Sequence, residues 1–155
     1  MRRLQVLLAA ALLSVGPCGL AQQVAQLTAS GGYDEIRQLL IIAIENQGLV
    51  VDHRSGVGDM LARTGKDLGE KRQLYEQAEV LQFCSANYSR QMMDAAPELL
   101  AFCPFGIGIY TLPGESGKVH LVYRRMHTEG LAPAAAQALQ RIDALLQEII
   151  RDASQ

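Results

Sequence analysis

The sequence predicts an α+β fold in a single domain, and two patterns carry this prediction. Residues 105–112 and 118–125 alternate between apolar and other side chains around a turn at 113–117, which is typical of a β-hairpin. Residues 133–152 instead repeat apolar side chains at helical spacing, so a helix there packs one stripe against an apolar surface, most simply the sheet. Strands and helices mixed in this order are typical of the α+β class.

Length and charge narrow the class of protein further. A chain of 155 residues has the size of one ordinary domain, and no internal repeat or long linker divides it. The net charge of -2 and the isoelectric point near 5.9 leave no basic surface of the kind that binds nucleic acid. We therefore expect no nucleic-acid partner, and neither length nor charge indicates a specific activity.

Residues 1–21 have the layout of a secretory signal peptide. Two arginines follow Met1, residues 4–15 are almost entirely apolar, and small residues precede a cleavage position at Gln22. The apolar run is shorter than the roughly 20 residues that span a bilayer. We expect a periplasmic or secreted protein whose mature domain, residues 22–155, has no transmembrane segment.

Two alternatives for this first segment fit less well. An N-terminal core helix would not need a charged start and a small-residue end. Lipidation of Cys18 is disfavoured by Pro17 immediately before it. Cleavage after Ala21 removes Cys18, so that Cys84 and Cys103 are the cysteines of the mature domain.

Local patterns predict the remaining elements in chain order. Residues 23–29 give a weak signal for an edge strand. Asp34 and Glu35 favour the start of a helix that ends before Gly48, and a short strand follows over 49–54.

The middle of the chain is mixed. Residues 59–78 predict a short helical turn that Gly65 and Gly69 interrupt, within the most charged stretch of the sequence, and we interpret these charges as a solvated surface. A strand over 79–84 and a helix over 86–95 follow.

The predicted hairpin has two different faces. Pairing across the turn brings Tyr110 near His120 and Gly108 near Val122, and the opposite face is predicted core. Glycine in a strand leaves bare backbone that a ligand can approach, although its more ordinary role is to accommodate a helix or a partner subunit, as in a homodimer. The semi-polar face is our candidate surface for a ligand or a partner, and it consists of Gly106, Gly108, Tyr110, His120 and Arg124.

Three interpretations of Cys84 and Cys103 stay open. A disulfide requires the chain to return over 97–102 after the helix, because the two Cα atoms must come within roughly 7 Å. A redox thiolate is favoured at Cys84 by its place just before a helix N-terminus. Two buried structural thiols are the third interpretation, and we rank the two structural interpretations ahead of the functional one.

A metal centre has little support from the sequence. The histidines and cysteines show no zinc-like spacing. Only folding could assemble a soft-metal set from Cys84, Cys103, Met92 and His120, and a methionine at a helical position is more often part of the core. The sequence also lacks paired carboxylates, a nucleophile elbow and a phosphate loop, so we assign no catalytic residue and no cofactor.

Residues 79–125 resemble the family known as the domain of unknown function 302. The resemblance lies in Phe83-Cys84-Ser85-Ala86 before a helix, in Phe102-Cys103-Pro104 before an alternating strand, and in the returning strand 119–124. A looser match extends it over residues 24–125, although many members have Asn-Pro after the first cysteine, where this chain has Ser85-Ala86. The resemblance implies a TATA-binding-protein-like curved antiparallel sheet covered by helices, often dimeric, and it implies no established activity.

Two functional hypotheses follow. The first is a periplasmic, non-enzymatic binding or accessory domain that uses the semi-polar face of the hairpin. The second is a thiol-redox or metal-handling protein that acts through Cys84 and Cys103.

Overall fold

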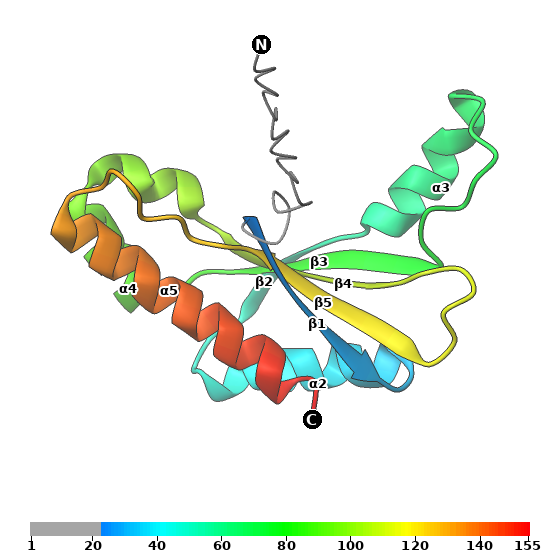
Figure 1. Ribbon diagram of the computed structural model, residues 1–155, viewed down its shortest axis with the longest axis horizontal. Coiled ribbons are helices and arrows are strands. Elements are labelled where there is room, and N and C mark those ends of the chain that lie inside the picture. Colours follow the sequence, from blue (N-terminus) through cyan, green and yellow to red (C-terminus); the bar gives the residue numbers. More distant parts are fainter. Residues whose placement is uncertain (1–22) are drawn as a thin grey trace, which may run out of the picture.

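The computed structural model describes residues 23–155 and confirms the predicted α+β class in one domain (Figure 1). The signal-peptide prediction falls on residues 1–21, outside the described part of the chain. The elements, in chain order, are β1 (Val24–Ser30), α2 (Tyr33–Asn46), β2 (Val51–Ser55), α3 (Val57–Asp67), β3 (Gln77–Phe83), α4 (Ala86–Ala95), the 3₁₀ helix η1 (Pro97–Phe102), β4 (Phe105–Thr111), β5 (Lys118–Arg124) and α5 (Pro133–Asp152).

The strands form one antiparallel sheet in the order β1-β5-β4-β3-β2. β4 and β5 are the predicted hairpin, and their register pairs Tyr110 with His120 and Gly108 with Val122, as expected. β1 lies at one edge of the sheet, which confirms the weakly signalled edge strand, and β2 lies at the other. β2 begins at Val51, two residues later than predicted.

The core lies on one face of the sheet, where α2 and α5 pack. Every apolar position in the stripe of α5 is buried, because a period of 3.6 residues keeps those side chains on one side of the helix. α4 packs in turn against α5. The hairpin residues predicted to be core are all buried there: Phe105, Ile107, Ile109, Val119, Leu121 and Tyr123. Among residues 23–155, no helix has the length and apolarity needed to cross a bilayer.

Helix α3 is the main departure from the predicted elements. The expected short turn is an eleven-residue helix that continues through Gly65 and ends before Gly69, whose φ is +74°. A glycine inside a helix costs only about 1 kcal/mol, so Gly65 weakens the helix without ending it. Figure 1 shows α3 projecting from the sheet on the side opposite α2.

The base of α3 sits directly on β3. A Cβ atom at Gly58 would lie 2.8 Å from the backbone nitrogen of Ala78, so only glycine allows this approach. Ala78 precedes Glu79, whose side chain pairs with Arg37 of α2 on the core face. Because successive side chains of a strand point to opposite faces, α3 begins on the face that α2 and α5 leave free.

Candidate functional site

The face of the sheet turned away from α2 and α5 carries the residues predicted to bind a ligand or a partner. We call it the open face. Alternation along each strand assigns its members: Gln26 and Thr28 of β1, Ala78, Val80 and Gln82 of β3, Gly106, Gly108 and Tyr110 of β4, and His120, Val122 and Arg124 of β5.

His120 is the anchored centre of this face. Its Nδ1 lies 3.1 Å from the Gln26 amide nitrogen and 3.1 Å from the Thr28 hydroxyl, and its Nε2 lies 2.9 Å from a Glu115 carboxylate oxygen. Because Glu115 can only accept, we assign the proton to Nε2, and Nδ1 then accepts from Gln26. The side chain is only 9% exposed, so these hydrogen bonds compensate for its burial. Because both ring nitrogens are within hydrogen-bond distance of partners, the His120 ring is held in one orientation on the open face.

Tyr110 and Tyr75 extend this anchor into an aromatic row. The Tyr110 ring stacks on His120 with centroids 4.8 Å apart. Tyr75, just before β3, meets Tyr110 edge-on with centroids 5.3 Å apart. Burial, followed by the proximity of Tyr75 and Glu115, raises the pKa of Tyr110 further above the neutral range.

The two strand glycines make room for neighbouring valines. A Cβ atom at Gly108 would lie 3.0 Å from a Val122 methyl carbon, and one at Gly106 would lie 3.3 Å from a Val80 methyl carbon. The space above each glycine is therefore filled from the adjacent strand. Val80 and Val122 therefore form a shallow apolar region in the middle of the open face.

Arg124 does not join the His120 group. Its guanidinium lies 5.5 Å from the centre of the Phe102 ring of η1, a distance at which a cation is attracted to an aromatic face. At about 3.4 Å per residue, Tyr110 lies roughly 17 Å along β4 from Phe105, which follows η1 in the chain. The five predicted residues thus share one face, but only Tyr110 and His120 come together.

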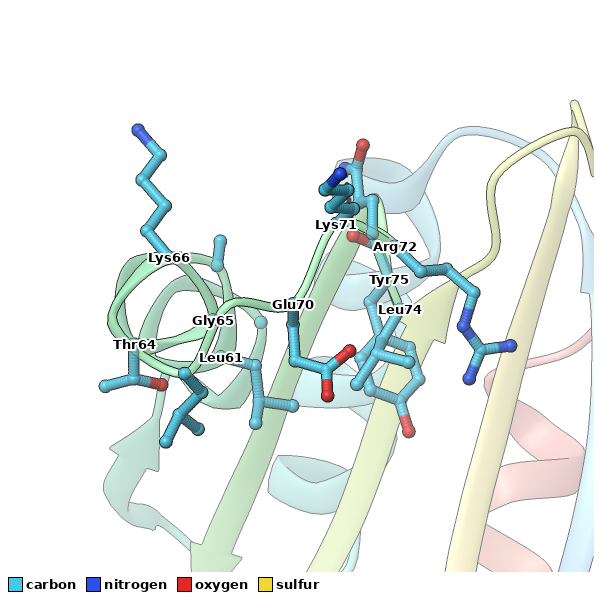
Figure 2. A pocket seen from close by; sticks show the side chains of 13 residues that line it. Leu61, Thr64, Gly65, Lys66, Glu70, Lys71, Arg72, Leu74 and Tyr75 are labelled. Atoms are coloured by element: carbon cyan, nitrogen blue, oxygen red, sulfur yellow. Dashed lines mark hydrogen bonds between the residues drawn. The ribbon is translucent and has the colours of Figure 1, made fainter.

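A cavity that the sequence did not indicate adjoins this cluster. It has a volume of about 710 Å³ and lies between α3 and the segment 68–75, which returns the chain to β3. Figure 2 shows Leu61 of α3, the Glu70 carboxylate and Tyr75 along this gap, while Lys66 points away from it. Its apolar lining comes mainly from Leu61, Ala62, Leu68, Leu74 and Tyr75. The charged residues along it are Lys66, Glu70, Lys71 and Arg72, of which Lys66 directs its ammonium group outward.

We interpreted this stretch as a solvated surface, and its charged side chains are indeed exposed. The overlooked signal is the leucines among those charges. Leu68 is 76% exposed and Leu74 is 43% exposed, although burial of a leucine contributes about 2 kcal/mol. Exposed leucines beside a cavity are typical of a binding surface.

The thiols of Cys84 and Cys103 meet at the end of the sheet remote from His120. Both are free, and Cys84 is exposed, so the interpretation as two buried thiols is wrong for Cys84. Shielding of its sulfur, then the Cys103 thiol and the Asp52 carboxylate, raise the pKa of Cys84. This direction is opposite to the thiolate that the helix N-terminus alone would favour.

The residues of the conceivable soft-metal set do not assemble. Met92 is fully buried in the core, and His120 lies at the other end of the sheet from the thiols. Within residues 23–155, no three side chains of histidine, cysteine, aspartate or glutamate are grouped to hold a metal ion.

Comparison with known proteins adds a family and a fold. The family model for Domain of unknown function DUF302 matches residues 25–149. A crystal structure of an uncharacterized conserved DUF302 protein from Bacillus stearothermophilus is similar, with a TM-score of 0.69 over 84% of this chain and 97% of that chain. The two sequences are 15% identical, so this likeness concerns the fold. A search of curated proteins found no match.

Proposed function

The chain belongs to the DUF302 family, and from that premise we propose that it is an exported, non-enzymatic binding domain for a small amphipathic molecule. The observation that carries the proposal is the cavity beneath α3, with the aromatic row at its side. Its volume of about 710 Å³ falls within the range of small-molecule sites.

The lining defines the class of ligand. Leu61, Leu74 and Tyr75 offer an apolar wall for a hydrocarbon or aromatic body. Glu70 lines the cavity, where its carboxylate would accept hydrogen bonds from a ligand, and the cations Lys71 and Arg72 would attract an acidic group. An apolar body with a polar end therefore suits this site better than a sugar or a nucleotide.

The aromatic row supports binding rather than chemistry. Tyr75 lines the cavity and contacts Tyr110, whose ring is held by His120. His120 has both ring nitrogens occupied, so it is poorly placed to take a proton from a substrate. A wall fixed in this way binds with little loss of side-chain entropy.

Titration with the fluorescent probe anilinonaphthalene sulfonate tests the proposal. Wild-type protein should bind it saturably, and Leu74→Lys should weaken binding at least about tenfold by placing a charge in the apolar wall. Ile42→Lys on α2 is the matched control, because Ile42 is 41% exposed and Leu74 is 43% exposed. Equal loss in both variants would contradict the proposal.

Sedimentation velocity separates a small ligand from a second copy of the chain. We expect the same sedimentation coefficient for wild type and Leu74→Lys. A dimer that Leu74→Lys dissociates, together with no saturable probe binding, would contradict the small-molecule site and favour a homodimer on the open face.

Export is a separate part of the proposal, and it rests on the sequence of residues 1–21. Expression of the full chain in a Gram-negative host followed by N-terminal sequencing of the periplasmic fraction tests it. We expect mature protein beginning at Gln22. Full-length protein retained in the cytoplasm, or a lipid-modified Cys18, would contradict it.

A further inference from the structure

A pair of thiols lies at the end of the sheet opposite the proposed ligand site. β3 and β4 pair up to Phe83 and Phe105, the last residues of their ladder. Cys84 directly follows Phe83, and Cys103 lies two residues before Phe105, so the strand pairing brings both cysteines to the same end of the ladder. The Cys103 thiol is close enough there to raise the pKa of Cys84, and a disulfide requires their Cα atoms to lie within roughly 7 Å.

The fold of residues 97–102 creates this meeting. α4 ends at Ala95, and the short helix η1 then turns the chain back to the start of β4. The Sγ atom of Cys103 lies 3.2 Å from the hydroxyl of Ser89 on α4. The backbone N–H of Cys84 donates to the Asp52 carboxylate at 3.2 Å. Both cysteines are therefore held in place by contacts from other elements.

We propose that Cys84 and Cys103 form a dithiol site that a disulfide-bearing oxidant converts to an intrachain bridge. Cys84 is the exposed thiol, so it meets the oxidant, and the half-buried Cys103 follows. This site is separate from the cavity and does not depend on the proposed ligand.

The exchange balances without any other reactant. Cys84 loses its proton to solvent, and its thiolate attacks one sulfur of the oxidant, which releases the other sulfur as a thiolate. Cys103 then loses its proton and attacks the Cys84 sulfur, which breaks the mixed disulfide and releases the second thiolate. The protein gives up two electrons and two protons, and the oxidant leaves as two thiols. The Ser89 hydroxyl can donate to the Cys103 thiolate during the second step.

Oxidation of the reduced full chain by glutathione disulfide, with and without a thioredoxin-fold dithiol oxidase, tests the proposal. Trypsin cuts after Arg90, between the two cysteines, so their peptides remain joined only when bridged. We expect a monomer that has lost two hydrogens and yields this joined pair. Faster oxidation with the enzyme identifies a protein disulfide as the better oxidant, and equal rates identify the small disulfide.

Single variants supply the controls. In Cys103→Ser the reaction should stop at a glutathione adduct on Cys84. In Ser89→Ala, which retains both cysteines, that adduct should live longer than in the wild type. The bridged protein should melt roughly 10 °C above the reduced protein, because the bridge closes the loop that contains α4 and η1. Stable glutathione adducts on both cysteines of the wild type, or bridges only between chains or to Cys18, would overturn the proposal.

Discussion

Asp52 contributes to the titration of a thiol that lies 32 residues away in the sequence. Its carboxylate accepts a hydrogen bond from the backbone N–H of Cys84. Desolvation of the sulfur, then the Cys103 thiol and last the Asp52 charge raise the pKa of Cys84. A raised pKa leaves less thiolate at neutral pH, so the reduced pair reacts slowly until the pH rises. The same direction means that the Cys84 proton stabilises the folded state at neutral pH, and this stabilisation is lost as the pH rises through the folded-state pKa.

Asp52→Asn should therefore make Cys84 more reactive. The amide oxygen can still accept the backbone hydrogen bond, but the charge is gone, so alkylation by iodoacetamide at pH 7 should accelerate a few-fold. Asp59→Asn is the control, because it removes a carboxylate from the first turn of α3. Mass spectrometry of the Cys84 peptide gives both rates, and equal rates in the two variants would contradict this assignment.

His120 marks the limit of sequence reasoning at the scale of a residue. Alternation in the hairpin placed it correctly opposite Tyr110. Its burial depends on Gln26, Thr28 and Glu115, which come from an edge strand and a turn. The weak signal of β1 gave no register against β5, so these partners could not be predicted.

Regular alternation and amphipathic periodicity predicted most elements, and α3 shows where they fail. The core strands and α5 each bury one side, so the spacing of their apolar residues predicts the type of element. α3 has no buried residue, and its Gly58 allows a close approach to β3 that no local sequence pattern indicates. The meeting of Cys84 and Cys103 was left open for a related reason, since it depends on how η1 turns the chain.

Gly58→Ala tests the packing contact between the start of α3 and Ala78 of β3. The new methyl group would lie 2.8 Å from the Ala78 nitrogen and 3.2 Å from its carbonyl oxygen, and backbone atoms cannot move aside cheaply. We expect a loss of about 1–3 kcal/mol in unfolding free energy and weaker probe binding.

Gly65→Ala in the same helix is the matched control for this substitution. The nearest atom to its new methyl group would be the Cβ of Glu70 at 3.8 Å, and alanine favours a helix over glycine by up to about 1 kcal/mol. Urea denaturation should show Gly65→Ala at least as stable as wild type. A Gly58→Ala protein as stable as Gly65→Ala would show that the contact does not hold α3.

At the scale of the whole molecule, the fold separates two surfaces. One face of the sheet is covered by α2 and α5 and forms the hydrophobic core with them. At one end, the open face carries the aromatic row of Tyr75, Tyr110 and His120, with the cavity beside it. The two thiols lie together at the other end of the sheet. A binding site and a dithiol site can thus operate on one small domain with independent tests.

The most direct test of the binding proposal is an amide-resolved NMR titration of the full chain with anilinonaphthalene sulfonate. We predict saturable shift changes at Leu61, Leu74 and Tyr75, continuing to Tyr110, and their loss in Leu74→Lys. Shift changes centred on the exposed Leu39 and Ile42 of α2, or changes that do not saturate, would contradict a binding site beneath α3.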